Sequence, residues 1–302
     1  MRSLPALAAA CLLFVPFLTA CETSPDAGAR AEQEAYEVEL DYGPVSERYR
    51  REAGTADESL FERVDLPTPT DERLGSGEPG PGYWQQRVDY EMDVEVDTEN
   101  DALSGDMRVT YHNNSPHQLD YFWIQLEQNL FHPDSLGARS HAPGGVLRGR
   151  PTFPGGYDIA YVRAGGQNLE YSVYDTLMRV ELPNPIEPGG TFNYELGWSF
   201  PVPPYLRRMG MEVVEQGKIF EFAQWFPHAC KYDDVNGWNT LPYLGTGEFY
   251  TDFGSYDVSI TVPDDYVVAA TGELANAREA LTESERANLQ RARASDEPVY
   301  VI

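Results

Sequence analysis

The sequence has few positive charges. Of its 302 residues, 22 are Lys or Arg and 49 are Asp or Glu, which gives a formal net charge of −27. A protein that binds duplex nucleic acid needs a basic face for the phosphates, so this charge balance excludes that class of function. The hydrophobic content of 41% and the aromatic content of 12% are high enough for a packed core, which argues against a disordered chain.

Long hydrophobic runs are absent except at the N-terminus. Arg2 precedes an apolar stretch, residues 4–18, which has the length of a signal-peptide core and is short for a membrane span. The stretch ends in Leu18-Thr19-Ala20-Cys21, which resembles the lipobox of bacterial lipoproteins. We therefore expect residues 1–20 to be a lipoprotein signal peptide and Cys21 to carry the lipid anchor. The alternatives are an ordinary secretory signal followed by chance by a cysteine, and a buried apolar helix.

Cysteine is scarce as well, with three in the whole chain. Cys11 lies in the expected signal peptide and Cys21 is the expected lipidation site, so Cys230 alone remains. An internal disulfide is then excluded, and the exported domain must be stable through its own core. Glu22 rather than Asp follows Cys21, which favours the outer over the inner bacterial membrane.

Two regions follow the signal peptide. Residues 21–82 are acidic, rich in Pro and Gly near their end and without regular apolar periodicity, and we interpret them as a largely disordered tether. Residues 83–302 contain short segments in which apolar and polar residues alternate, separated by turn residues. This pattern predicts an all-β domain, a curved, saddle-like β-sandwich of many short antiparallel strands. The expected strands are residues 90–96, 103–111, 121–126, 178–182, 192–200, 220–224, 256–262 and 267–270.

Near the C-terminal end the pattern changes. Residues 281–294 have a helical spacing of apolar positions, with Thr282 or Ser284 as the expected cap, and predict one short helix. Residues 299–302 have the composition of the beginning of a strand, and no turn follows them. We therefore expect the chain to be a fragment that ends before a further domain.

Common catalytic motifs are missing: HExxH, GxGxxG, GxSxG and a P-loop do not occur. The five histidines are scattered, and no two have the i, i+4 spacing that places both rings on one helix face for zinc. His228 and Cys230 could lie near each other on an extended segment, but no third ligand is evident. We expect no metal site in this chain and no catalytic activity of the chain alone.

Four stretches carry a resemblance to a known family. They read Q-W-F-P-H-A-C-K-Y-D-D at residues 224–234, G-W-N at 237–239, G-E-F-Y-T-D-F-G at 247–254 and V-A-A-T-G-E-L at 268–274. Together they resemble the N-terminal domain of aminopeptidase N-like zinc metallopeptidases, the gluzincin group, in its bacterial lipoprotein form. The resemblance covers roughly residues 83–302.

The resemblance implies a function for the domain. It would roof the active-site cleft of a catalytic domain that follows it, and would help to bind the N-terminus of a peptide substrate. In the family that second domain holds Zn(II) through HExxH and a distant Glu, and it carries G-x-M-E-N; neither motif is present here. Phe226 stands where many members have a Gln or Glu that contacts the substrate amine.

The resemblance assigns one substrate-binding residue, Gln224, because it lies in the family's amine-contacting loop. Its amide offers both an acceptor and donors. A purely structural role, in which Gln224 satisfies backbone groups beside an aromatic core, is the alternative. Two other functions stay open for the whole chain: a non-catalytic surface lipoprotein whose β-sandwich binds a peptide, glycan or protein, and a pseudo-enzyme that has lost its zinc motif. An HExxH motif about one domain downstream would favour the peptidase.

Overall fold

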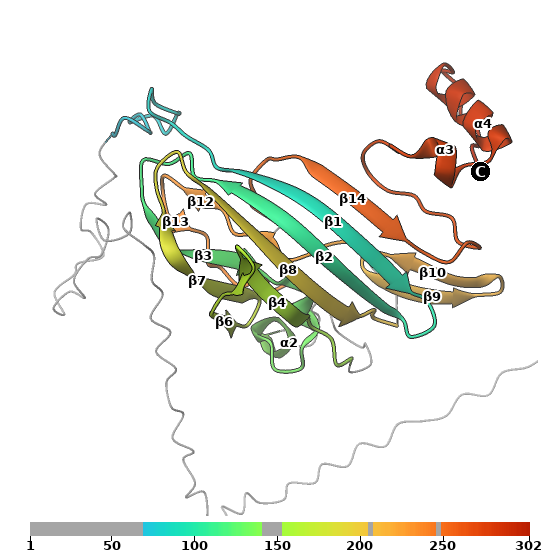
Figure 1. The fold of residues 1–302 in the computed structure, drawn as a ribbon, viewed down its shortest axis with the longest axis horizontal. Coiled ribbons are helices and arrows are strands. Elements are labelled where there is room, and N and C mark those ends of the chain that lie inside the picture. The colour runs from blue at the N-terminus through green and yellow to red at the C-terminus, as the bar shows by residue number, and fades with distance from the viewer. Residues whose placement is uncertain (1–68, 141–152, 205–207, 246–248) are drawn as a thin grey trace, which may run out of the picture. The chain divides into compact units, whose positions relative to one another are not determined.

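The computed structural model describes residues 69–140, 153–204, 208–245 and 249–302. The chain there consists mostly of strands in several antiparallel sheets with few helices, which confirms the all-β prediction (Figure 1). The expected signal peptide, Cys21 and residues 22–68 of the expected tether lie outside the described residues. Among the described residues, no helix has the length and apolar character needed to cross a membrane.

The larger sheet has six strands in the order β14-β1-β2-β8-β4-β5. The long strands β1, β2 and β8 run side by side and antiparallel, as Figure 1 shows, while β14 pairs parallel to β1. Strict alternation along β1 and β2 buries one face and leaves the other exposed. The strands are β1 (Arg87–Asp97), β2 (Ala102–His112), β4 (Asp158–Ala164), β5 (Gln167–Asn168), β8 (Thr191–Pro201) and β14 (Tyr256–Thr261).

A four-stranded sheet, in the order β11-β3-β7-β6, covers the buried face of the larger one. Its strands are β3 (Leu119–Gln125), β6 (Tyr171–Tyr174), β7 (Leu177–Ile186) and β11 (His228–Ala229). Aromatic side chains join the two layers: the ring of Phe122 on β3 lies 4.8 Å from that of Tyr111 and 5.4 Å from that of Tyr194, centroid to centroid. The core is therefore the space between the two sheets, as in a β-sandwich.

Short elements complete the described fold. They are the hairpin of β9 (Gly210–Val214) and β10 (Gly217–Glu221), the pair β12 (Tyr232–Asp233) and β13 (Gly237–Trp238), and the helices η2 (Glu127–Phe131), α2 (Leu136–Ser140), α3 (Ala277–Ala280) and α4 (Glu283–Arg293). The Thr282 side chain accepts from the Glu285 backbone N–H, and the Glu285 carboxylate accepts from the Thr282 backbone N–H. This capping box confirms the helix predicted at residues 281–294.

Three local predictions are wrong. Residues 267–270 form no strand, because no strand among the described residues pairs with them. The strand expected at residues 178–182 does not end there: residues 183–186 also belong to β7, since Ile186 pairs with Leu119 of β3. The strand expected at residues 220–224 ends at Glu221, because the backbone leaves the extended conformation soon afterwards.

The last part of the expected tether makes specific contacts. Arg73 donates two hydrogen bonds to the Asp234 carboxylate, from Nε and Nη2, each 2.7 Å long. Asp234 follows β12 directly, and its side chain is only 5% exposed. Two parallel hydrogen bonds from a guanidinium are a strong and directional contact. The described part of the tether, residues 69–82, is therefore attached to the β-domain, and the boundary at residue 82 stays a prediction.

Candidate functional site

The 224–228 turn, from Gln224 to His228, connects the end of the β10 segment to β11. Gln224 has a φ of 50°, in the left-handed region that residues other than glycine rarely adopt. Its backbone carbonyl accepts a hydrogen bond of 2.7 Å from Gln128 Nε2 and one of 3.4 Å from the Tyr157 hydroxyl. Side chains from η2 and from the segment before β4 thus stabilise an otherwise unfavourable backbone conformation.

The side-chain amide of Gln224 has a different environment from the backbone carbonyl of the same residue. It is partly buried and makes no hydrogen bond with the described residues. The structural alternative required this amide to satisfy nearby backbone groups, but here the Gln128 side chain satisfies the backbone of Gln224. Within the part of the chain that the structure describes, the donors and the acceptor of this amide are therefore unused. Its role in binding a substrate stays a prediction.

The other end of the turn is held by a buried acid. Glu127, whose side chain is 1% exposed, has its Oε1 atom 2.9 Å from Nδ1 of His228, which is 14% exposed. Neither carboxylate oxygen of Glu127 has a hydrogen bond of good geometry with the described residues. The consecutive residues Glu127 and Gln128 thus contact the two ends of the turn. The sequence analysis identified neither residue. Glu and Gln are rarely buried, and these two are buried directly after an apolar strand.

The Phe226 ring lies beside His228, and the Tyr256 ring lies beside Phe226. The Phe226 ring is 6.1 Å from the His228 ring and 6.2 Å from the ring of Tyr256 on β14, measured between centroids. Phe226 is partly buried and Tyr256 is exposed. The turn therefore combines free polar groups with apolar surface, the mixture that is typical of small-ligand sites.

A buried ion pair lies next in sequence. Lys231 Nζ contacts Asp252 Oδ1, and both side chains are almost inaccessible to solvent. Burial raises the pKa of Asp252, and the contact with Lys231 opposes that shift. Asp252 lies four residues before β14, so this pair attaches the segment leading into β14 to the segment leading into β12.

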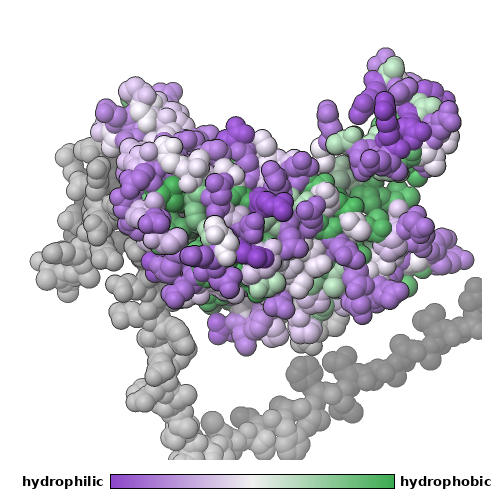
Figure 2. Space-filling model, in the orientation of Figure 1, coloured by the Kyte–Doolittle hydropathy of each residue, from purple (hydrophilic) through white to green (hydrophobic). Residues whose placement is uncertain are grey.

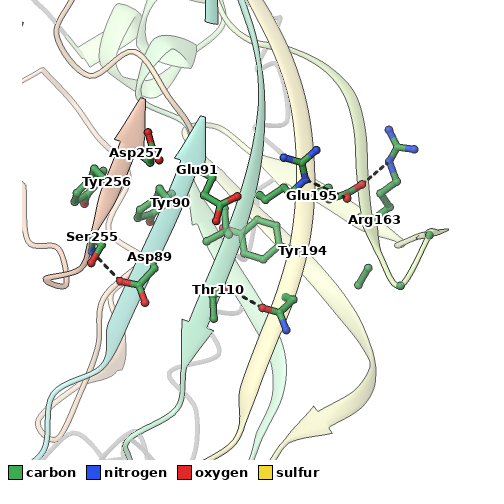
Figure 3. Close-up of a pocket in the computed structure, with 16 residues that line it drawn as sticks. Asp89, Tyr90, Glu91, Thr110, Arg163, Tyr194, Glu195, Ser255, Tyr256 and Asp257 are labelled. Atoms are coloured by element: carbon green, nitrogen blue, oxygen red, sulfur yellow. Dashed lines mark hydrogen bonds and ion pairs between the residues drawn. The ribbon is translucent and has the colours of Figure 1, made fainter. Parts of the chain in front are cut away.

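A separate cavity of about 500 Å³ lies on the polar face of the six-stranded sheet (Figure 3). Glu195 on β8 lies 3.5 Å from Arg163 and 3.9 Å from Arg108, so it pairs with two cations. Thr110 Oγ1 donates to Asn193 Oδ1 over 2.8 Å. Arg163 and Glu195 keep 37% and 45% of their side chains exposed, although Nε of Arg163 is itself buried and makes no hydrogen bond with the described residues. Gln224 does not line this cavity, so the cavity and the turn are distinct features.

Metal ligands do not gather in the described part of the chain. No group of three or more His, Cys, Asp or Glu side chains there could hold a metal ion. A catalytic zinc requires about three protein ligands and an open position. These residues therefore do not fit the Zn(II) that the resemblance implies, and we derive no step through it; that the chain binds no catalytic zinc stays a prediction.

No protein-family model matches the chain, and no curated protein matches it. The solved structures that resemble it include M1 zinc metallopeptidases. The M1 zinc metallopeptidase from Deinococcus radiodurans has a TM-score of 0.37 and 17% identity, over 65% of this chain and 36% of that one. A mutant of the Deinococcus radiodurans M1 enzyme bound to a Tyr-Ser-Ala substrate has a TM-score of 0.35 and 17% identity, over 66% and 38%.

A two-domain M1 zinc metallopeptidase mutant bound to L-tryptophan gives similar values, a TM-score of 0.34 and 16% identity over 65% and 37% of the two chains. Similarity at this level concerns the fold alone. This chain spans between 36% and 38% of the length of the three structures.

Proposed function

We propose that this chain is the N-terminal β-domain of a membrane-anchored, aminopeptidase-like zinc metallopeptidase. The domain would roof the active-site cleft of a second domain and help to bind the N-terminus of a peptide. The observation that carries the proposal is the 224–228 turn. It lies within the stretch with the most specific resemblance to the family, and it holds the Gln224 backbone in place while leaving the side-chain amide unused.

Exposed apolar side chains on β14 and on the β9–β10 hairpin support the proposal that this domain covers a second domain. Val258 and Ile260 on β14 point to the same side as the buried core residues of β1, yet they are 36% and 39% exposed. Val213 and Ile219 of the β9–β10 hairpin are exposed as well. Figure 2 shows hydrophobic surface on the side where β9, β10 and the end of β14 lie. Apolar surface of this kind is typical of an interface with another domain.

The decisive experiment uses the protein encoded by the complete gene. We expect it to bind zinc and to release the first residue of an aminoacyl p-nitroanilide, and we expect a chelator to abolish this activity. We expect residues 21–302 alone to be inactive. A complete protein that binds peptides without hydrolysing them would contradict the proposal and favour the non-catalytic lipoprotein.

The role of Gln224 can be tested in the same protein. Gln224→Ala should lower kcat/KM for free-amine substrates about tenfold, the loss of one hydrogen bond to a charged group, and leave the melting temperature nearly unchanged. Gln167→Ala, at an exposed glutamine of β5, is the matched control and should change neither quantity. A lower melting temperature with intact kinetics would make Gln224 a structural residue.

We also propose that Cys21 carries a lipid anchor, on the basis of the lipobox after an apolar stretch of signal-peptide length. Two or more acyl chains give stable membrane attachment, since each buried CH₂ contributes about 0.8 kcal/mol. Cys21→Ala should therefore move the protein from the membrane fraction to the soluble one. Unchanged fractionation with membranes would refute the anchor.

A further inference from the structure

The outer edge of β14 is not paired with any strand of the described chain. β14 is the outermost strand at one end of the six-stranded sheet, so one of its edges pairs with β1 and the other is free (Figure 1). On the paired side, the carbonyls of Phe253 and Ser255 accept from the backbone N–H groups of Val88 and Tyr90. The side chains of β14 are all exposed, so the strand is accessible along its whole length.

The register shows which main-chain groups point to the free edge. In a parallel pair, alternate residues of a strand direct their N–H and C=O groups to the same neighbouring strand. Tyr90 lies opposite Tyr256 but donates to Ser255, one position earlier. The N–H and C=O groups of Tyr256, and by alternation those of Val258 and Ile260, therefore point away from β1. They form a row of donors and acceptors that another chain can pair with.

β14 lacks the features that usually protect a strand edge. Proteins protect such edges with Lys or Pro, with bulges, or by keeping the edge strand very short. β14 contains neither Lys nor Pro, and its register with β1 continues without a bulge from Tyr256 to Thr261. The other edge strands of the two larger sheets are shorter: β5 and β11 have two residues each and β6 has four. Of these edges, that of β14 is the best suited to strand addition.

One face of the sheet is apolar beside the free edge. Val258 and Ile260 lie on the same side as the core residues Met92 and Val94 of β1, yet both are exposed. Tyr256 extends this row and is exposed as well. A strand added at the edge gains stability by burying apolar side chains against the row.

The opposite face is acidic at the same place. The exposed carboxylates there are Glu91, Asp93 and Glu95 of β1 and Asp257 of β14. The register places Glu91 directly beside Asp257. Arg108 lies opposite Glu91 on β2 but pairs with Glu195, and no ion pair joins these four carboxylates to a cation of the described residues. Like charges on neighbouring positions repel each other, so this face favours an added strand that carries cations.

We propose that the outer edge of β14 binds an extended cationic peptide by strand addition, in which Lys or Arg alternates with apolar residues. The peptide backbone pairs with the outward groups of Tyr256, Val258 and Ile260. Side chains of a strand alternate between the two faces, so the apolar residues continue the apolar row while the basic residues lie beside the four carboxylates. Main-chain hydrogen bonds supply the affinity, and the two faces supply the specificity.

The proposal goes beyond the proposed function, because it involves neither Gln224 nor a catalytic domain. An interface between the apolar face of β14 and a second domain is compatible with it, since the face and the edge of a strand are different surfaces. A second copy of this chain is a poor occupant. Two β14 edges paired with each other would bring two sets of carboxylates together, and the chain has a net charge of −27.

The test uses residues 21–302 and three octapeptides with blocked ends: (Lys-Val)₄, (Glu-Val)₄, and (Lys-Val)₄ with every amide nitrogen methylated. Calorimetric titration should show that (Lys-Val)₄ binds about tenfold more tightly than the other two, because one lacks the cations and the other lacks the main-chain donors. Equal affinity for the three peptides, or no binding of (Lys-Val)₄, would overturn the proposal.

Hydrogen exchange locates the bound peptide. In the free chain the amides of Val258 and Ile260 should exchange quickly, and those of Asp257 and Ser259, which point to β1, more slowly. Bound (Lys-Val)₄ should slow exchange at the first pair about tenfold and leave the second pair nearly unchanged. Protection at other residues only would contradict strand addition to β14.

The same measurement identifies other occupants of the edge. Slow exchange at Val258 and Ile260 in the free chain, together with dimers in analytical ultracentrifugation, would assign the edge to a second copy. Slow exchange at these residues in the protein encoded by the complete gene, without peptide, would assign the edge to another segment of that protein. Either result would overturn the proposal.

Two variants separate the main chain from the charges. Val258→Pro removes an outward N–H and no hydrogen bond to β1, so it should weaken (Lys-Val)₄ binding about tenfold. Asp257→Lys should reduce the preference for (Lys-Val)₄ over (Glu-Val)₄ about tenfold, because it reverses a charge beside the edge. Asp158→Lys, at an exposed carboxylate of β4, is the matched control and should keep the preference.

Asp257→Lys keeps the test valid if Val258→Pro does not fold. A folded Val258→Pro variant with unchanged affinity would overturn the proposal, as would an unchanged preference in Asp257→Lys or an equal reduction in Asp158→Lys. The outcomes are independent of those for the proposed function. Aminopeptidase activity of the complete protein without binding of (Lys-Val)₄ would refute the role of β14 alone. Strand addition to a complete protein that is not a peptidase would refute the proposed function alone.

Discussion

Strands β1 and β14 lie next to each other in one sheet and have the same alternation of apolar and polar residues, yet they are packed differently. Tyr90 and Met92 on β1 are each 3% exposed, whereas their partners on β14, Tyr256 and Val258, are 51% and 36% exposed. The four-stranded sheet covers β1 but does not extend over β14. An alternating sequence thus shows which face of a strand is apolar, and not whether anything covers that face.

The comparison predicts that contacts outside β14 hold it in place. Lys231→Ala should cause the largest loss of stability, about 3–5 kcal/mol, because it leaves the Asp252 carboxylate buried without its cation. Lys218→Ala is the matched control, since its partner Asp101 and Lys218 itself are each 28% exposed; it should cost about 1 kcal/mol or less. Urea unfolding measures both. Similar losses for the two variants would show that the buried pair does not anchor β14.

Truncation of matched core positions tests the comparison directly. Met92→Ala on β1 should lower the free energy of unfolding by about 2–5 kcal/mol, the usual cost of emptying a packed site. Val258→Ala on β14 should cost about 1 kcal/mol or less, because the side chain retains much of its contact with water. Denaturant unfolding of residues 21–302 provides both values. A large loss for Val258→Ala would mean that β14 has a cover outside the described residues.

The smallest expected effect on stability comes from the contact between Asp89 and Ser255, at the start of β14. The Asp89 carboxylate accepts from the Ser255 backbone N–H over 2.8 Å, and the Arg87 guanidinium holds the pKa of Asp89 far below its ordinary value of 3.8. The folded state therefore binds fewer protons than the unfolded state as pH falls below about 5, so stability declines with decreasing pH. We expect a loss of about 1 kcal/mol between pH 5 and pH 2, moderated by solvent screening.

Asp89→Asn should flatten this pH dependence in thermal unfolding experiments. Asp120→Asn, at an exposed carboxylate of β3, is the control and should leave the dependence as it is. Identical pH profiles for Asp89→Asn and the parent protein would show that this contact does not connect β1 to β14.

Local patterns predicted β1 and β2, which pair with each other, but missed β4, β5, β6 and β9, although these strands also pair with a sequence neighbour. The hairpin of β1 and β2 follows from alternation on both sides of an acidic turn, and α4 follows from its cap at Thr282. The parallel pairing of β1 with β14 could not be predicted, because no local signal specifies a partner that is distant in sequence. At residues 267–270 a strand was predicted where none forms, since these residues have a strand-like composition but no partner strand among the described residues.

Of the candidate site, the sequence pointed only to the residue at one end of the turn. The family-like motif identified Gln224, but not the left-handed backbone at this residue or the hydrogen bond from Gln128 that supports it. Glu127 and His228 are 101 positions apart and become neighbours only when β11 pairs with β3. Contacts of this kind depend on the tertiary fold and are invisible in the spacing of a single sequence.

The parallel pairing of β1 with β14 also has a consequence for the order of folding. Asp89 and Ser255 are 166 positions apart, so this edge of β1 stays unpaired until the segment that forms β14 has been synthesised. Contacts of such long range slow folding, and an unpaired strand edge favours association with other chains in the meantime. We therefore expect this domain to need protection from aggregation during its synthesis, and its refolding rate to be limited by the step that brings β14 to β1.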